Sequence, residues 1–190
     1  MPKRITQCRI CGNRQLIPIV DLGEQALTGR FVRDGEPDPT SGPLRAVLCY
    51  GPATVSPCGL LQLEHTYDLQ EMYGETYGYR SSMSKSMVEH LRLLVEKALK
   101  IVRPEPGDSI LDIGCNDGTL LKFYDKSGTE CFGVDPSSAK YQKDFPSGAG
   151  LLVDFFSRDA VRKAFGERRF KIITSIAMFY DLNDPLQFMR

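Results

Sequence analysis

Residues 109–124, SILDIGCNDGTLLKFY, constrain the fold of this chain more than any other segment. The first five residues have the composition of a buried strand, and the apolar residues after the turn have helical spacing. In the turn, Gly114 and Gly118 fill the outer positions of a G-x-G-x-G pattern, and Asn116 replaces the middle glycine. Asparagine tolerates a positive φ better than most residues. Because such a turn brings backbone and free helical N–H groups close to a ligand, the segment predicts a ligand-binding strand–turn–helix unit.

Strand-like and helix-like segments alternate through the rest of the C-terminal half. This alternation predicts an α/β fold with a parallel sheet and right-handed crossovers. Before it, the apolar spacing predicts a long helix at 81–102, with serines as candidate caps and RPEPGD as its stop. The elements expected after this helix are strands at 109–113, 130–134, 150–153 and 171–177, and helices at about 118–126, 137–144, 158–165 and from Asp184 and Pro185 onward.

The last expected strand, in KIITSIAM, is apolar on both faces, which is typical of the centre of a parallel sheet. No further strand follows it, and four strands make about half of a doubly wound sheet. We therefore interpret the chain as a fragment, a truncated gene product or a half that another copy completes. Self-association through the unpaired sheet edge is expected.

The N-terminal part differs in composition from the rest. Residues 1–66 contain four of the six cysteines and seven of the twelve prolines. Prolines and glycines at this density preclude long helices and predict a small, loop-rich module. Such a module has little hydrophobic core, so a metal ion would be an effective staple.

The spacing of these cysteines predicts a structural zinc site. Cys8 and Cys11 form a C-x-x-C knuckle, which suits tetrahedral zinc. Cys49 and Cys58 are separated by eight residues, and removing GPATVS between them would leave a second knuckle. We therefore expect zinc on these four cysteines, provided that the insertion loops out. His65 is a spare ligand candidate, and buried thiols without metal are the alternative.

Composition and charge exclude several classes of function. Lys and Arg total 24 and Asp and Glu total 24, so no net charge recruits nucleic acid or a membrane surface. No apolar run is long enough to span a bilayer, and the N-terminus MPKRITQC lacks the apolar stretch of a secretory signal. We therefore expect a cytoplasmic protein, in which cysteines serve as metal ligands or buried residues more often than as disulfides.

Acidic residues stand at or near the ends of the expected strands, where open parallel sheets bind ligands. Asp112 lies near the end of the first strand, and Asp135 ends the second one 23 residues later. A carboxylate at the second position can accept hydrogen bonds from both ribose hydroxyls of a nucleoside. Asp154 and Phe155, which follow the third strand, offer an acid and an apolar wall for a flat base.

Taken together, ILDIGCNDGTLL, GVDPS and DFF resemble the S-adenosylmethionine (SAM) fold of class I methyltransferases. A dinucleotide-binding Rossmann domain and a structural α/β domain are the alternatives. The resemblance implies that the turn faces the methionine end of SAM, Asp135 with Pro136 the ribose, and Asp154 with Phe155 the adenine.

Two further groups of residues join the expected cofactor site. Tyr77 and Tyr79 lie on the loop before helix 81–102, which flanks the cofactor in this fold, although they could equally anchor the loop. Ala177 and Met178 follow the fourth strand, where methyltransferases place residues that face the substrate.

The four-cysteine module with CGLLQLEHTYD, YGETYGYRSSMSKSMVEHL and SIAMFYDLNDP resembles the sugar C-methyltransferases. The resemblance covers essentially the whole chain and implies a zinc-binding module at 1–66, a connecting loop at 67–80 and part of a SAM-binding domain at 81–190. It also implies a nucleotide-linked keto-deoxysugar as substrate. The catalytic residues would lie beyond Arg190, so this chain alone would be inactive.

Carbon methylation of a keto-sugar requires a base that removes the proton beside the carbonyl, so that the enolate attacks the methyl group of SAM. The implied function is therefore SAM-dependent C-methylation, with SAM and structural Zn²⁺ as cofactors. The alternatives are a non-catalytic module that binds SAM or a partner, and an O- or N-methyltransferase of small molecules. Nucleic-acid binding is disfavoured by the neutral charge.

Overall fold

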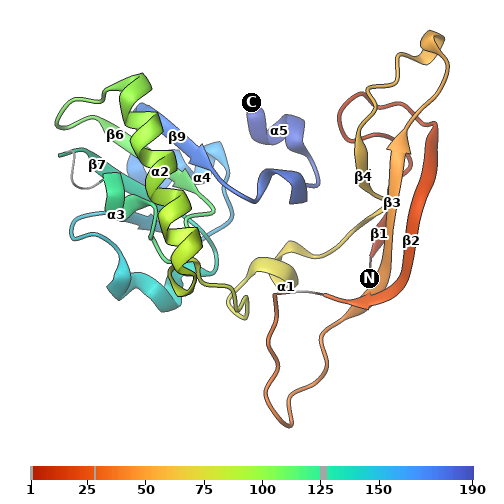
Figure 1. Cartoon of the computed structure of the whole chain (residues 1–190), viewed down its shortest axis with the longest axis horizontal. Helices are drawn as coiled ribbons and strands as arrows, with labels where there is room; N and C mark the ends of the chain where they lie inside the picture. The colour runs from red at the N-terminus through yellow and green to blue at the C-terminus, as the bar shows by residue number, and fades with distance from the viewer. Residues whose placement is uncertain (1, 28, 125–127) are drawn as a thin grey trace. The chain divides into compact units, whose positions relative to one another are not determined.

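A computed structural model describes residues 2–27, 29–124 and 128–190 of the chain (Figure 1). The chain divides into two compact units. One contains the residues up to Met72 together with Tyr180–Arg190, and the other is Tyr73–Phe179. The domain boundaries expected at 66 and 81 stay a prediction. None of the helices in the described ranges combines the length and the apolar character needed to cross a membrane.

The first unit is built on an antiparallel sheet with the order β2-β3-β4. The strands of this sheet are β2 Leu16–Ala26, β3 Ser41–Cys49 and β4 Leu61–Leu63. A second, two-stranded sheet pairs β1 Lys3–Arg4 with β5 His65–Thr66. The prolines were expected to preclude long helices, and the regular structure of this unit is a long β2–β3 hairpin between loops. Pro18 is compatible with the hairpin because it lies in β2, an edge strand.

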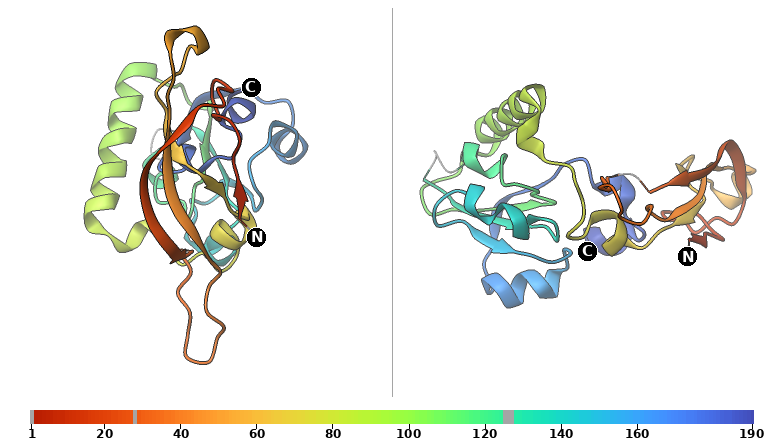
Figure 2. Two further views of the ribbon diagram at one scale, coloured as in Figure 1. Left: turned by 90° about the vertical axis from the view of Figure 1, so that its right-hand side faces the viewer. Right: turned by 90° about the horizontal axis from the view of Figure 1, so that it is seen from below.

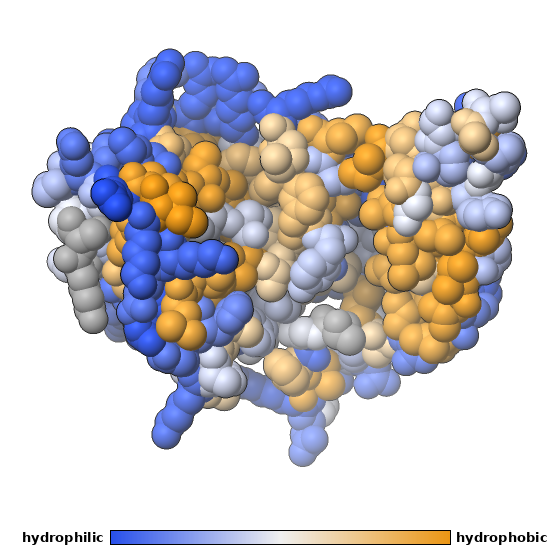
Figure 3. Space-filling model, turned by 45° about the horizontal axis from the view of Figure 1, so that its top comes forward, coloured by the Kyte–Doolittle hydropathy of each residue, from blue (hydrophilic) through white to orange (hydrophobic). Residues whose placement is uncertain are grey.

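One face of this sheet is covered and the other is open. Val47 and Cys49 are almost fully buried, whereas Ile17, Leu61 and Leu63 are 40%, 57% and 41% exposed. Hydrophobic side chains accordingly gather on the surface over these strands (Figure 3). The short elements of the unit are η1 Ala53–Val55, α1 Leu69–Tyr73 at its boundary, η5 Phe179–Asp181 and α5 Pro185–Met189.

The second unit contains the predicted parallel sheet, with the order β8-β7-β6-β9. The α/β fold class is thereby confirmed. The strands are β6 Ser109–Ile113, β7 Glu130–Val134, β8 Gly150–Leu152 and β9 Phe170–Ser175. The main helices are α2 Lys85–Val102, α3 Leu121–Tyr124 and α4 Arg158–Phe165, and α2 and α4 cover opposite faces of the sheet (Figure 2).

Most expected elements are present, with changes at their ends. The helix expected at 137–144 is the 3-10 helix η4 Ser138–Asp144, and the one expected at 118–126 begins at Leu121, with residues 125–127 outside the described ranges. The strand expected to run to 177 ends at Ser175, because Ala177 has φ of 55° and cannot continue an extended chain. The predicted helix at Pro185 is confirmed, and Asp184 caps it by accepting the N–H of Gln187.

The last strand, β9, was expected to leave one edge of the sheet unpaired. Within the described residues it pairs with β6 alone and forms an edge of the sheet. Ile172 is buried but Ile173 is 59% exposed, so only one face of the strand is covered. The strand thus has the unpaired edge expected from the sequence, although its apolar composition on both faces is typical of a central position.

The core of the second unit lies between α2 and the sheet. Leu91 and Val95 from α2 pack with Ile110, Leu121 and Tyr124, all of them almost fully buried. Each fully buried leucine or valine of this kind contributes about 1.5–3 kcal/mol. The helix α2 begins after a serine cap, in which the hydroxyl of Ser84 accepts the N–H of Met87 at 3.3 Å. This packing fixes the helix beside the strand that leads into the glycine-rich turn.

Candidate functional site

The four predicted zinc ligands converge in the first unit. The sulfur atoms of Cys8, Cys11, Cys49 and Cys58 all lie within 4.8 Å of one another. The closest pairs, Cys8–Cys58 and Cys11–Cys49, are 3.5 Å apart. Four sulfurs at about 2.3 Å from one zinc ion would be about 3.8 Å from each other, so the cluster fits tetrahedral zinc.

Local structure explains how distant cysteines meet. The first knuckle is closed by hydrogen bonds from the N–H of Cys8 to Asn13 O and from the N–H of Gly12 to Cys8 O. The residues between Cys49 and Cys58 loop out and contain η1, as the spacing required. The cluster therefore assembles from a tight turn, the end of β3 and the loop that follows it.

Neighbouring N–H groups lower the pKa of the thiols of Cys8 and Cys11 and so favour the thiolate form that zinc needs, whereas burial raises the pKa of Cys58 to about 12. Burial opposes ionisation of Cys8, but hydrogen bonds from the N–H groups of Cys11 and Ile10 lower the pKa of its thiol to about 6. The side chain of Asn13 donates to Cys49 Sγ at 3.4 Å and to Tyr50 O at 2.9 Å. Such outer contacts orient metal ligands and reduce the charge that thiolates must bear.

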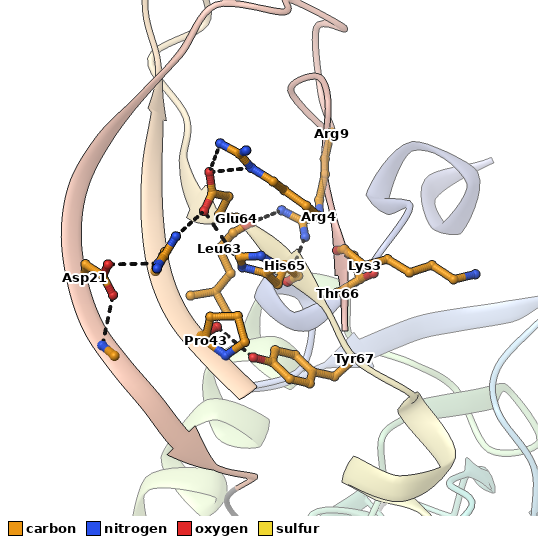
Figure 4. A network of polar contacts seen from close by, with 12 residues as sticks. Lys3, Arg4, Arg9, Asp21, Pro43, Leu63, Glu64, His65, Thr66 and Tyr67 are labelled. Atoms are coloured by element: carbon orange, nitrogen blue, oxygen red, sulfur yellow. Dashed lines mark hydrogen bonds and ion pairs between the residues drawn. The ribbon is translucent and has the colours of Figure 1, made fainter. Parts of the chain in front are cut away.

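His65, the spare ligand candidate, does not belong to the cluster of cysteines. It lies in a polar network around the buried Glu64 (Figure 4). Arg4 contacts Glu64 at 2.7 Å, Arg45 lies 4.0 Å from it, and Arg45 also pairs with Asp21 at 2.9 Å. A buried carboxylate needs such partners, so the network joins β1 to the sheet and has a structural role that sequence reasoning missed.

The glycine-rich turn of the second unit has the predicted backbone. Gly114, Asn116 and Gly118 have φ values of 78°, 48° and 73°, so Asn116 adopts the conformation that glycine would offer. Side chains also approach both glycines. A Cβ on Gly118 would lie 2.9 Å from the ring of Phe145, and one on Gly114 would lie 3.2 Å from Met178 Cγ. The positive φ values and the neighbouring side chains therefore favour small residues at both positions.

Asp135 lies beside this turn at the end of β7. It is buried, and its carboxylate accepts three hydrogen bonds: one from the N–H of Asn116 at 3.0 Å, and two from the N–H and hydroxyl of Ser137 at 2.7 and 2.6 Å. A carboxylate has about four acceptor positions. The protein therefore orients the Asp135 carboxylate and leaves it able to accept a further hydrogen bond. Its role toward ribose stays a prediction.

Asp112 is a buried carboxyl at the end of the neighbouring strand. The hydroxyl of Thr174 donates to it at 2.6 Å. Burial raises the pKa of Asp112 to about 7; the hydrogen bond from Thr174 opposes this rise and the charge of Asp135 adds to it. Two carboxyl groups therefore meet at the carboxyl edge of β6 and β7, and near neutral pH one of them is easily protonated.

The other predicted cofactor residues lie around this edge in less buried positions. Asp154 is exposed and accepts the N–H of Phe155 at 2.7 Å, directly after β8. The rings of Tyr77 and Tyr79 are 6.2 Å apart. Pro136, Phe155 and Met178 are half-buried, and Ala177 is exposed. The structure thus groups Asp112, the turn, Asp135 and Met178 closely, while the role of each toward a cofactor stays a prediction.

We predict that Asp112→Asn removes a pH dependence of stability. The folded chain holds the proton of Asp112 more tightly than the unfolded chain does, so its contribution falls as pH rises from about 4 to about 7. The variant should gain on the order of 4 kcal/mol relative to wild type over that range, measured by urea unfolding at both ends. Ile110→Val, a buried change on the same strand, should show a difference independent of pH. A constant difference for Asp112→Asn would contradict the prediction.

Comparisons with known proteins agree with this arrangement. Residues 8–73 match a family described as "Putative zinc binding domain", and residues 79–190 match a family described as "Methyltransferase domain". The C-methyltransferase NovU of Streptomyces niveus is 29% identical over 137 residues, which are 70% of this chain and 30% of NovU.

Other methyltransferases match a shorter part of the chain. The 23S rRNA (uracil(1939)-C(5))-methyltransferase RlmD of Ralstonia nicotianae is 34% identical over 47% of this chain and 20% of its own length. The ubiquinone biosynthesis O-methyltransferase of Cereibacter sphaeroides is 27% identical over 50% of this chain and 39% of its own. The matches thus span less than half the length of each relative. The family recognised from the sequence is confirmed: the chain belongs to the methyltransferases, with a zinc-binding domain ahead of the methyltransferase domain.

Proposed function

We propose that this chain binds SAM at the turn between β6 and α3 and takes part in methyl transfer to a carbon atom of a nucleotide-linked keto-deoxysugar. The observation that carries the proposal is the carboxyl edge of β6 and β7, where the backbone turn, Asp112 and Asp135 meet. The match to a methyltransferase domain over residues 79–190 supports SAM as the ligand of this edge.

Each part of the proposed site has a role in binding SAM. The turn offers backbone N–H groups and close approach to the methionine end, and Asp135 offers acceptors to the ribose hydroxyls. SAM, when bound, supplies an electrophilic methyl group. The chain's own residues would orient it and exclude water, and we assign the base that forms the enolate to no residue of this chain.

The substrate part of the proposal is supported by the C-methyltransferase NovU and by the resemblance of the sequence motifs to sugar C-methyltransferases. The second candidate is O-methylation of a small molecule, which the ubiquinone biosynthesis O-methyltransferases favour. A non-catalytic SAM-binding module is the third. A cytoplasmic location and self-association through the outer edge of β9 belong to the same proposal.

The test of SAM binding is calorimetry with S-adenosylhomocysteine. We expect the wild-type chain to bind and Asp135→Asn to bind about tenfold more weakly, because a neutral amide is a poorer acceptor for ribose hydroxyls. Asp159→Asn, an exposed change in α4, is the matched control and should bind as wild type does. No binding by a folded wild-type chain would overturn the proposed cofactor.

The test of the substrate uses the protein in its natural full-length form. With SAM labelled with ¹³C in its methyl group, a nucleotide-linked keto-deoxysugar should receive the label, and two-dimensional NMR should place it on a ring carbon. Attachment through oxygen would favour the second candidate. Absence of transfer to any keto-sugar acceptor, with SAM binding intact, would exclude the sugar proposal.

Zinc is the second proposed cofactor, held by Cys8, Cys11, Cys49 and Cys58. We expect about one zinc ion per chain by elemental analysis, and its loss in Cys58→Ser. Without zinc, the amides of β3 should exchange hydrogen rapidly, because metal binding and folding are coupled in modules of this size. Cys131→Ala removes a buried thiol of β7 and should retain the metal. Full zinc content in Cys58→Ser would contradict the assignment.

A further inference from the structure

The segment between α1 and α2, residues 74–84, is held by side chains of the glycine-rich turn. It carries Tyr77 and Tyr79 and contains little regular structure beyond η2 Ser81–Met83. A segment of this kind would be mobile unless contacts held it. Its contacts within the second unit are polar and specific, and they concentrate on the residues expected to bind the cofactor.

Asn116 binds the segment through both ends of its side-chain amide. Its Oδ1 accepts the N–H of Ser81 at 3.0 Å, and its Nδ2 donates to Tyr79 O at 3.1 Å. The backbone N–H of the same asparagine donates to Asp135. One residue therefore links the segment to the carboxylate that is proposed to hold ribose.

Asp117 and Arg80 form the second link. The carboxylate of Asp117 is completely buried and accepts the N–H of Ser82 at 3.1 Å and the Arg80 Nε–H at 3.2 Å. Arg80 also donates from Nη2 to Asp144 at 2.8 Å, at the end of η4. Its guanidinium lies 5.1 Å from the ring centroid of Tyr141. The planar fork of arginine presents separate N–H groups to the two carboxylates in a fixed geometry, which the point charge of lysine does not reproduce.

Lys140 adds a third link from η4. Its ammonium group donates to the carbonyl oxygens of Glu75 and Tyr77. The segment is thus fastened at its start by Lys140, at its middle by Arg80 and at its end by the backbone of Ser81 and Ser82. Burial in these contacts lowers the pKa of Lys140, while the nearby Asp135 and Glu75 oppose the shift.

We propose that Arg80 is a positioning residue for cofactor binding: by joining Asp117 to Asp144, it locks residues 74–84 onto the turn and presents Tyr77 and Tyr79 at the SAM site. This inference rests on the proposed function. Locking the segment in advance removes the entropy that would otherwise be lost when the cofactor orders it. The cofactor should therefore bind more tightly to the locked chain than to a chain in which the segment is loose.

The test compares Arg80→Ala, Arg80→Lys and Asp144→Asn with wild type by calorimetry with S-adenosylhomocysteine. We expect about tenfold weaker binding for Arg80→Ala and intermediate losses for the other two. The matched control is Glu167→Gln, which breaks the exposed ion pair with Arg162 in the same unit. It should leave the affinity unchanged.

Hydrogen exchange and melting temperatures separate positioning from general destabilisation. The amides of Ser81 and Ser82 should exchange faster in the Arg80 variants without cofactor, and cofactor should slow them again, while the melting temperatures of Arg80→Lys and Asp144→Asn stay near that of the control. If wild type binds the cofactor and Arg80→Ala binds it equally well, the inference alone is wrong. A loss of affinity that only follows a large fall in melting temperature also overturns it. No binding by wild type overturns the proposed function and this inference together.

Discussion

The second unit depends on how the buried polar turn between β6 and α3 is satisfied. Asn116 and Asp117 are 6% and 0% exposed, and a buried amide and a buried carboxylate destabilise a fold unless they are hydrogen-bonded. Thr119 supplies two local hydrogen bonds to Asp117, and the other partners come from residues 79–82 and from Asp135, which are distant in sequence. Satisfying the turn therefore fixes the start of α2, the end of β7 and the segment before α2 at the same time. The hydrogen bonds that satisfy these buried polar residues therefore also join the parts of the site.

The first unit has a small hydrophobic core and depends on other interactions for its stability. Its buried apolar residues are few, and the most buried among them include Cys8, Cys49 and Val47. Such a core cannot offset the chain entropy of a long hairpin and several loops. The network around Glu64 supplies part of the missing constraint through ion pairs, and the four converging thiols would supply the rest if they hold the proposed zinc ion. The two units thus carry independent sources of order, which suits a family built from two recognisable domains.

Local sequence patterns predicted the features that depend on residues close together in the chain. The bounds of β6, β7 and α4 match the expected ranges, Asn116 has the expected positive φ, and the cysteines meet across the predicted insertion. The density of prolines predicted the lack of long helices in the first unit but carried no information about the β2–β3 hairpin, whose pairing joins residues distant in sequence. The hydrogen-bond partners of Asn116, Asp117 and Arg80 could not be predicted, because contacts between residues distant in sequence produce no periodic pattern in the sequence.

The glycines show why a motif should be interpreted from its surroundings. Gly118 is required by its positive φ and by the ring of Phe145, and Gly133, in the middle of β7, would clash with Cys115 Sγ at 2.6 Å if it carried a Cβ. A glycine-rich turn could therefore persist in a protein that binds nothing. What distinguishes this turn is the pair of carboxyl groups, Asp112 and Asp135, buried beside it. Burying two acids together is unfavourable for folding alone, so their presence at the carboxyl edge of a parallel sheet favours a ligand that uses them.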